Sequence, residues 1–138
     1  MNEMTIGRLA KQAAVKHETV RYYEKRGLMP KPEKNASGYR LYSERDLARL
    51  QFIKRSQSLG FTLKEIDELL SLQGSDSATC QQVRNFTAEK LSDIEQRINE
   101  LKRMKKALTS LAKSCTAEGP TTECPIIDAI ESMSDDNE

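Results

Sequence analysis

The chain has 138 residues, of which 37% are hydrophobic, 31% are charged and none is tryptophan. This length suits one ordinary domain or two small units that share an element. Six glycines and four prolines are too few to separate many short strands, which favours a mostly α protein over a β-sandwich or barrel. No run approaches the roughly 18 to 20 apolar residues of a membrane-spanning helix, and the first residues lack a signal-peptide pattern. We therefore expect a cytoplasmic protein with no membrane partner.

The net charge of +1 hides an asymmetry between the two parts of the chain. Residues 1–55 hold 13 Lys and Arg against 6 Asp and Glu, whereas residues 56–138 hold 9 against 15. All four tyrosines also lie within the first 42 residues. A basic, tyrosine-bearing N-terminal part indicates a polyanion partner such as nucleic acid, although a solvated charged surface would give the same balance.

The N-terminal residues predict two short helices joined by a tight turn. The first covers residues 6–14 with Thr5 as its N-cap, and the second covers residues 18–26 and ends at Gly27. Only the three residues 15–17 connect them. This pattern predicts a helix-turn-helix, although a purely structural helical hairpin has a similar sequence.

A turn-rich, basic stretch follows the second helix. Residues 30–38 lead into an alternating stretch at 39–42, which predicts a small two-stranded wing with its tip near residues 35–38. Two capping-box patterns, at residues 43–46 and 62–65, then open two further helices.

The second half of the chain predicts one long helix over about residues 80–113. This stretch contains no Gly or Pro, and a capping pattern at residues 79–82 precedes it. A helix of about 50 Å cannot bury its apolar stripe against two short helices, so we expect a second copy of the chain to cover it in a homodimer. A lone charged helix is the alternative, which is disfavoured because isolated helices gain little stability without packing. The stripe follows a/d heptad spacing, with Lys105 at one a position: Leu91, Ile94, Ile98, Leu101 and Leu108.

A hinge-like loop after residue 73 divides the chain into two predicted domains, residues 1–73 and residues 74–138. Cys124 and Pro125 fit the N-cap and first position of a last short helix. The composition of residues 134–138 predicts a disordered tail.

Nothing in the sequence predicts an enzyme. His17 is the only histidine, and no Ser/His/Asp set, glycine-rich phosphate loop or HExxH motif occurs. A catalytic His–Cys pair would need His17 to lie against the C-terminal half, for which the sequence gives no argument.

Cys80, Cys115 and Cys124 are the residues that carry chemistry. An odd number of cysteines in a reducing compartment disfavours disulfides. Cys80 and Cys124 lie at predicted helix N-termini, which favour the thiolates that soft metals bind. Cys80 and Cys115 are about 52 Å apart along one straight helix, so they cannot share a metal within one chain. In an antiparallel pair of helices, Cys80 of one protomer would meet Cys115 and Cys124 of its partner; scattered thiols or a redox switch remain alternatives.

Five short segments follow one another over about residues 4–72: TIGRLA at 5–10, TVRYYE at 19–24, GL at 27–28, GYRLY at 38–42 and LGFTLKEI at 59–66. In this order they resemble the MerR family of bacterial transcription regulators. In the C-terminal half, Cys80 and Cys115 are followed by CPII at residues 124–127. This pattern resembles the mercuric-ion-responsive members, which have a cysteine at each end of the dimerisation helix and a third, followed by Pro, nine residues later.

The resemblance implies a winged helix-turn-helix on an antiparallel coiled-coil dimer. It implies that this dimer binds a promoter whose −35 and −10 elements are too far apart. Metal binding would then kink and untwist the DNA so that RNA polymerase engages both elements. The family also implies that Arg21 and Tyr22 lie on the recognition helix, and that Arg40 and Tyr42 of the wing clamp the DNA backbone. The full set of implied DNA-contacting residues is Lys16, His17, Thr19, Arg21, Tyr22, Tyr39, Arg40 and Tyr42.

The choice of metal follows from a comparison between subfamilies. Copper sensors lack an equivalent of Cys80, and zinc sensors add a second cysteine, where this chain has Ser114, and a loop histidine. Three thiolates without a fourth ligand suit trigonal Hg(II), which is the predicted effector, with Pb(II), Cd(II) and Zn(II) as alternatives. A drug sensor would need a larger ligand domain, and an iron–sulfur redox sensor would need clustered cysteines. A metal-binding protein without a role on DNA is the remaining alternative.

Overall fold

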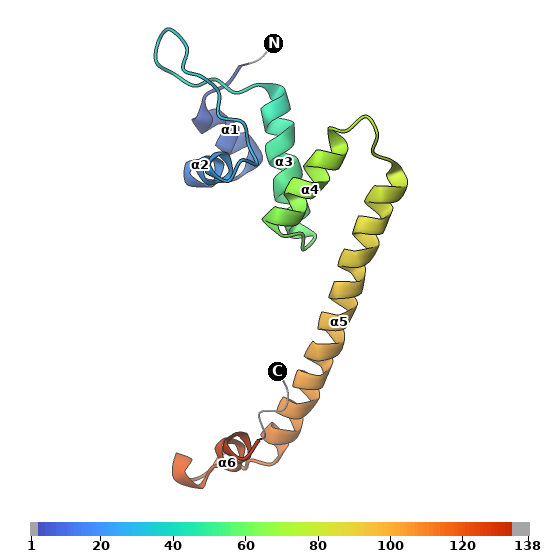
Figure 1. Ribbon diagram of the computed structural model, residues 1–138. Coiled ribbons are helices and arrows are strands. Elements are labelled where there is room, and N and C mark those ends of the chain that lie inside the picture. The colour runs from blue at the N-terminus through green and yellow to red at the C-terminus, as the bar shows by residue number, and fades with distance from the viewer. Residues whose placement is uncertain (1–2, 134–138) are drawn as a thin grey trace. The chain divides into compact units, whose positions relative to one another are not determined.

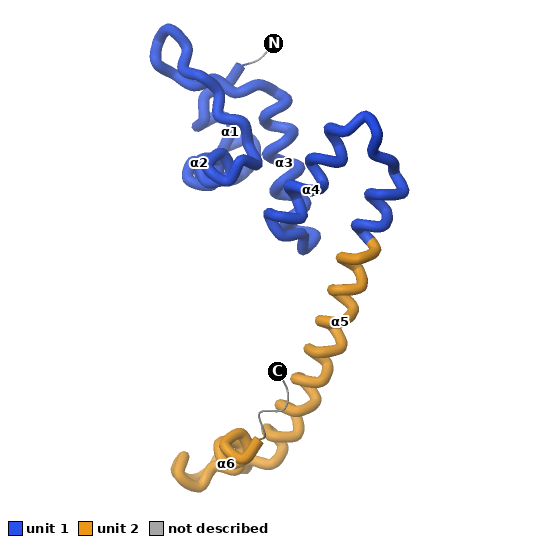
Figure 2. The backbone as a smooth tube through the Cα atoms, viewed as in Figure 1, with its two compact units in different colours: residues 1–87 blue, residues 88–138 orange. Residues whose placement is uncertain are grey.

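The computed structural model describes residues 3–133, whose regular secondary-structure elements are all helices (Figure 1). The chain divides into two compact units, Met1–Thr87 and Ala88–Glu138 (Figure 2). None of the described helices combines the length and apolar character that a bilayer crossing requires. The helices are α1 (Ile6–Ala13), α2 (His17–Lys25), α3 (Glu44–Ser58), α4 (Leu63–Gln73), α5 (Cys80–Lys113), a 3-10 helix η1 (Thr121–Glu123) and α6 (Pro125–Glu131).

The predicted helix-turn-helix is confirmed in α1 and α2. The hydroxyl of Thr5 accepts a 3.3 Å hydrogen bond from the amide of Arg8 and caps α1. Ala14, which we expected inside this helix, instead adopts a left-handed conformation with φ 56° and ends it. Gly27 follows α2 with φ +78°, the conformation that a glycine at this position supplies without steric cost.

A single hydrophobic core joins the first four helices to the base of the wing. Each side chain in it is removed from water, and full burial of a large apolar side chain contributes about 1.5 to 3 kcal/mol. This core fixes the positions of α2 and the wing relative to each other. Its most deeply buried large side chains are Leu9, Val20, Tyr42, Leu50, Ile53 and Ile66.

The wing forms at the predicted residues, but as a loop closed by isolated antiparallel bridges rather than by two strands. One bridge pairs Lys34 with Arg40, and another pairs Met4 with Tyr42 at the base of the wing. Pairing is this short because prolines occupy positions 30 and 32 and have no amide hydrogen to donate to a neighbouring strand. The tip turns at residues 35–38, as expected.

Both capping boxes form as predicted. At α3, the amide of Asp46 donates to Ser43 Oγ (3.2 Å) and the amide of Ser43 donates to Asp46 Oδ2 (2.8 Å). At α4, Thr62 and Glu65 exchange the same pair of bonds, 2.8 and 3.2 Å long.

The long helix α5 begins and ends at the predicted residues, 80 and 113. Thr79 caps it, since its amide donates to Gln82 Oε1 (2.7 Å) and its hydroxyl accepts from the amide of Gln82 (3.3 Å). None of its 34 residues is buried. In the first unit, Phe86 on this helix stacks on Phe61, with ring centroids 5.7 Å apart.

The last helix, α6, also begins where the sequence predicted. Cys124 is its N-cap and Pro125 its first residue. The helix η1, which precedes it, was not predicted. The tail expected at residues 134–138 lies outside the described residues.

Candidate DNA interface and metal centre

Helix α2 presents Arg21 and Tyr22 to solvent. The Tyr22 side chain is 46% exposed, and its hydroxyl accepts a 2.9 Å hydrogen bond from Arg26 Nη1. The Arg26 guanidinium also lies 5.8 Å from the centre of the Tyr22 ring, within the range of a cation–π contact. These two contacts order an exposed aromatic ring on the surface of the helix before any partner binds.

Three candidate residues surround the start of α2. Lys16 is its N-cap in extended conformation, but its side chain makes no capping bond. His17 is exposed, and a Cβ added at Gly7 would lie 3.5 Å from its Nε2, so the ring lies directly over α1. Thr19 is half-buried. Lys16 and His17 thus place a cation and an imidazole at the surface beside the turn.

The three candidate residues of the wing differ sharply in exposure. Tyr39 is 63% exposed and Arg40 is half-buried, whereas Tyr42 is only 1% exposed. The Tyr42 hydroxyl donates a 2.8 Å hydrogen bond to Oε2 of Glu24 on α2. Burial, followed by this bond, raises the pKa of Tyr42, so the phenol remains a donor at neutral pH. In this structure Tyr42 therefore fixes the wing on α2 and presents almost no surface for the DNA clamp that the family resemblance implied.

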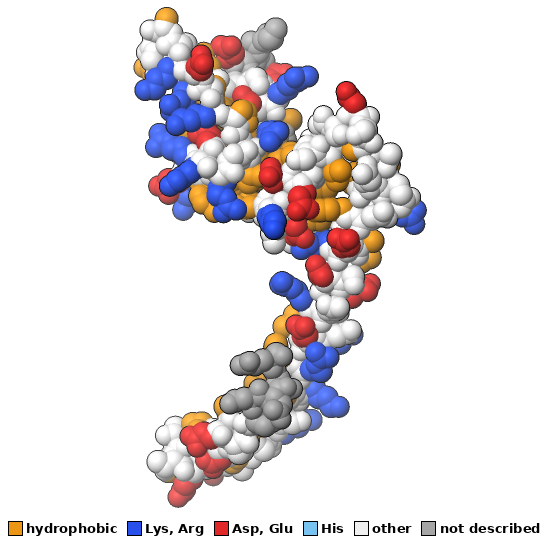
Figure 3. All heavy atoms as spheres, in the orientation of Figure 1, with side chains coloured by type: hydrophobic (Ala, Val, Ile, Leu, Met, Phe, Trp, Pro, Cys, Tyr) orange, Lys and Arg blue, Asp and Glu red, His pale blue; other side chains and the backbone are white. Residues whose placement is uncertain are grey.

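A cleft of about 170 Å³ separates α2 from the wing. Cations outnumber carboxylates among its described lining residues, so an anion of phosphate charge suits it better than an apolar ligand. Figure 3 shows Lys and Arg side chains gathered over α2 and the wing on this face of the first unit. The lining residues are Thr5, Ile6, Arg21, Glu24, Lys34, Gly38, Tyr39, Arg40 and Tyr42.

The second unit brings two of the three cysteines together. Cys115 lies just beyond the end of α5, and its Sγ accepts a 3.3 Å hydrogen bond from the amide of Ala117. The amides of Ile127 and Ile126 at the N-terminus of α6 lower the pKa of Cys124, and a contact with the Cys115 side chain lowers it further. The loop therefore holds the Cys115 side chain beside Cys124 and favours the thiolate of Cys124.

Cys80 lies in the other compact unit, as the exposed first residue of α5. The 34 residues of this helix span about 50 Å at 1.5 Å per residue, and Cys115 follows its opposite end. Within one chain, residues 3–133 contain no group of three His, Cys, Asp or Glu side chains that could hold a metal ion.

Two residues with clear structural roles were not predicted from the sequence. Glu24 belongs to the TVRYYE segment, but nothing in that segment indicates its bond with Tyr42. Lys54 on α3 hydrogen-bonds to the end of α1, 40 residues earlier, and no local pattern signals such a contact.

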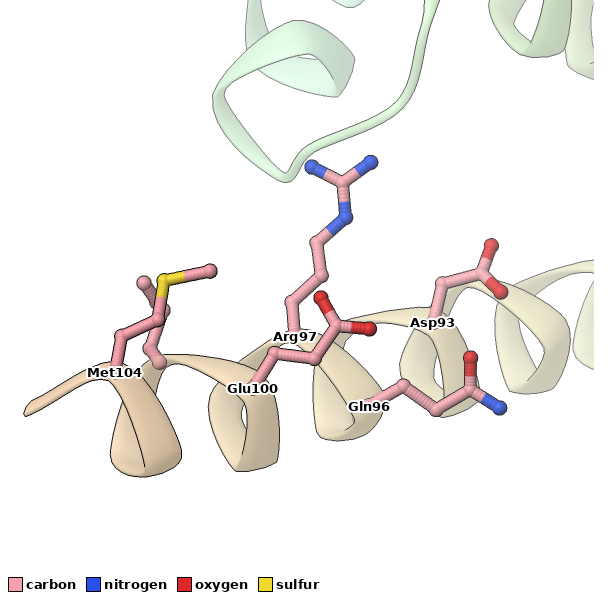
Figure 4. A pocket seen from close by; sticks show the side chains of 6 residues that line it. Asp93, Gln96, Arg97, Glu100 and Met104 are labelled. Atoms are coloured by element: carbon pink, nitrogen blue, oxygen red, sulfur yellow. The ribbon is translucent and has the colours of Figure 1, made fainter. Parts of the chain in front are cut away.

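An open hollow also lies along the exposed part of α5. Figure 4 shows that its labelled side chains come from this one helix and spread apart rather than converge on a point. It has no opposing wall among its described lining residues, so it does not resemble a small-molecule site. These residues are Asp93, Gln96, Arg97, Glu100, Leu101 and Met104.

Comparisons with known proteins agree with this geometry. A family model described as "MerR HTH family regulatory protein" matches residues 4–73, and one described as "MerR, DNA binding" matches residues 47–111. The mercuric resistance operon regulatory protein of Bacillus cereus is 46% identical over 125 residues, covering 91% of this chain and 95% of its own.

Two solved structures are similar over nearly the whole chain. MerR from Bacillus megaterium MB1 in complex with mercury(II) has a TM-score of 0.71 at 42% identity, covering 93% of this chain and 99% of its own. PbrR691 from Ralstonia metallidurans CH34 in complex with lead(II) has a TM-score of 0.81 at 35% identity, covering 92% and 98%. With the helix-turn-helix, the wing and the long helix in place, the chain belongs to the MerR family of DNA-binding transcription regulators.

Proposed function

We propose that this protein is a Hg(II)-responsive transcription regulator that binds promoter DNA as a homodimer in the cytoplasm. The observation that carries the proposal is the pairing of Cys115 with Cys124 in one unit, while Cys80 begins the long helix in the other. The names of the Bacillus relatives, which refer to mercuric resistance and to bound mercury(II), support the choice of metal.

The exposed seam of α5 supports the homodimer. Its apolar a and d side chains are 36 to 62% exposed in the single chain, which leaves the apolar stripe on both sides of Lys105 in water. A second α5 packed antiparallel would cover this stripe and place the start of each helix beside the end of its partner. Each Cys80 would then face the Cys115–Cys124 pair of the other protomer.

The chemistry of the thiols supports a soft metal. Thiolate sulfur selects soft cations, and binding three of them releases the protons that the thiols still carry. Hg(II) accepts three sulfur ligands without a fourth donor, whereas structural zinc sites are four-coordinate. Pb(II) is the second candidate, because the similar PbrR691 structure contains lead(II).

The division into units suggests how metal binding reaches the DNA. Cys80 belongs to the same compact unit as the helix-turn-helix, whereas Cys115 and Cys124 belong to the other unit. A metal bound by all three would tie the DNA-binding unit of one protomer to the C-terminal unit of its partner. We infer that this link changes how the two DNA-binding units engage the promoter, so that RNA polymerase can use it.

Run-off transcription from the promoter upstream of the protein's own gene tests this function. The full chain and RNA polymerase are titrated with Hg(II), Pb(II), Cd(II) or Zn(II) in a thiol-buffered solution. We expect activation at the lowest concentration with Hg(II), and none with Cys80→Ser, Cys115→Ser or Cys124→Ser, each of which still binds the promoter. Ser114→Ala is the matched control and retains the response. Stronger activation by Pb(II) than by Hg(II) would contradict the choice of metal, and DNA binding without any metal response would contradict the sensor function.

A further inference from the structure

Among the described residues, Glu24 is the only carboxylate that lines the cleft between α2 and the wing. Arg21, three residues before it on α2, lies on the same helix face, since side chains at i and i+3 are neighbours. Arg40 and Lys34 line the same cleft from the wing. A carboxylate in this position has several cations in its surroundings, and arginine forms the strongest pairs with it.

Glu24 is nevertheless bonded to a phenol. Its Oε2 accepts the 2.8 Å hydrogen bond from the hydroxyl of Tyr42. Tyr42 cannot move to follow a different partner, because its backbone pairs with Met4 through bonds of 2.8 and 2.7 Å and its side chain is buried. The restraint therefore acts on the Glu24 carboxylate, one oxygen of which is held by the phenol of Tyr42.

We propose that Tyr42 is a positioning residue that holds the Glu24 carboxylate away from Arg21 and Arg40, so that the cleft can accept a DNA phosphate. This inference rests on the proposed DNA binding and assigns the cleft between α2 and the wing as a phosphate subsite. Without the phenol hydroxyl, Glu24 is free to pair with one arginine, and that arginine no longer contacts DNA.

Four full-length proteins test the inference: the wild type, Tyr42→Phe, Glu24→Gln, and the double variant Tyr42→Phe/Glu24→Gln. Binding to a duplex of the protein's own promoter is measured by fluorescence anisotropy over a series of salt concentrations. One lost phosphate contact per protomer removes two contacts from the dimer. This lowers the salt slope of log K by about 1.8, which is about 60-fold in affinity at 0.1 M salt. We expect this loss for Tyr42→Phe. We expect the double variant to bind within about twofold of Glu24→Gln, because glutamine has no charge with which to form an ion pair with arginine.

Tyr23→Phe is the matched control. Tyr23 is also a buried tyrosine whose hydroxyl donates to a side chain, but its partner is the neutral Gln57. Loss of this bond releases no carboxylate, so the salt slope should stay at the wild-type value. Circular dichroism at the assay temperature verifies that each variant is folded.

The outcomes separate the inference from the function on which it rests. A wild-type protein that binds its promoter no better than a scrambled duplex would overturn the proposed function, and the inference with it. If the wild type binds the promoter, a double variant as weak as Tyr42→Phe would show that the phenol has only a structural role. An unchanged salt slope in Tyr42→Phe would overturn the inference equally.

Discussion

The ammonium group of Lys54 on α3 donates 3.0 Å hydrogen bonds to the carbonyl oxygens of both Ala13 and Ala14. These carbonyls lie at the C-terminus of α1, where backbone acceptors lack helical partners and the helix dipole favours a cation. Ala14 is also the left-handed residue that ends the helix. Lys54 therefore stabilises the point at which α1 ends and the turn to α2 begins.

Replacing Lys54 with methionine keeps most of the apolar stem of the side chain but removes both hydrogen bonds. We expect a folded protein whose free energy of unfolding falls by about 1 kcal/mol, the usual net contribution of such bonds. Urea unfolding at a fixed protomer concentration measures this free energy of unfolding. Lys64→Met, at an exposed lysine on α4, is the control, and equal losses in the two variants would contradict the role of Lys54.

Arg40→Ala and Arg21→Ala should weaken DNA binding in different ways. Arg40 lies in the wing, where we expect a phosphate contact, so its loss from both protomers should lower affinity for all duplexes and reduce the salt slope by about two. Arg21 is exposed on α2, the expected recognition helix, so its loss should reduce discrimination between promoter and scrambled DNA by about 1 to 3 kcal/mol if it reads a base edge. Anisotropy titrations on both duplexes measure the two effects, and wild-type binding by both variants would contradict the interface.

Charges in the seam of α5 should dissociate the homodimer. Aspartates at Ile98 and Leu101 would be buried without partners between the two helices, which costs several kcal/mol. Sedimentation velocity should show a monomer for Ile98→Asp/Leu101→Asp. The control, Gln96→Asp/Ser110→Asp, adds the same charge at heptad positions opposite the seam and should remain dimeric. A dimer with normal helicity in the seam variant would place the interface elsewhere.

The sequence predicted the elements whose boundaries depend on local hydrogen bonds. Ser43 with Asp46 and Thr79 with Gln82 begin helices by bonds between residues three apart, so their patterns are visible in the chain itself. The three cysteines were also identified from their spacing, and their roles as ligands stay a prediction.

Contacts between distant residues could not be predicted in the same way. The bond from Tyr42 to Glu24 joins residues 18 apart, and that from Lys54 to Ala14 joins residues 40 apart. Both hydrogen bonds depend on how the core orients α2, α3 and the wing, and no spacing pattern in the sequence indicates this orientation. The family resemblance placed Tyr42 at the DNA, but it could not show that the side chain is buried.

The thiol of Cys124 should ionise at lower pH in the folded protein than in the unfolded chain. The amides of Ile127 and Ile126 favour its thiolate and lower its pKa, and unfolding removes them. Iodoacetamide pulses over a pH series, with peptide mass spectrometry, give the alkylation rate of Cys124 relative to its plateau at high pH. The pH at which the rate reaches half its maximum should be lower for the native protein than for the protein in urea. Coincident curves would contradict this effect of α6.

The last prediction concerns the bridging metal site and uses mixed dimers. A Cys80→Ser chain keeps Cys115 and Cys124, and a Cys115→Ser chain keeps Cys80. Their heterodimer therefore contains one complete set of three thiols, formed by Cys80 of the second chain and the cysteine pair of the first. Since α5 spans about 50 Å, the set is complete only if the two helices run antiparallel.

Differently tagged chains allow the heterodimer to be purified and titrated with Hg(II) in a thiol buffer. It should bind about one Hg(II) with the ultraviolet signature of three-sulfur coordination, whereas the wild-type dimer should bind about two. Either mutant homodimer should lack this signature, because each of its sites has at most two thiols. A three-sulfur signal in a mutant homodimer, or its absence from the heterodimer, would show that the metal is not held by Cys80 of one protomer with Cys115 and Cys124 of the other.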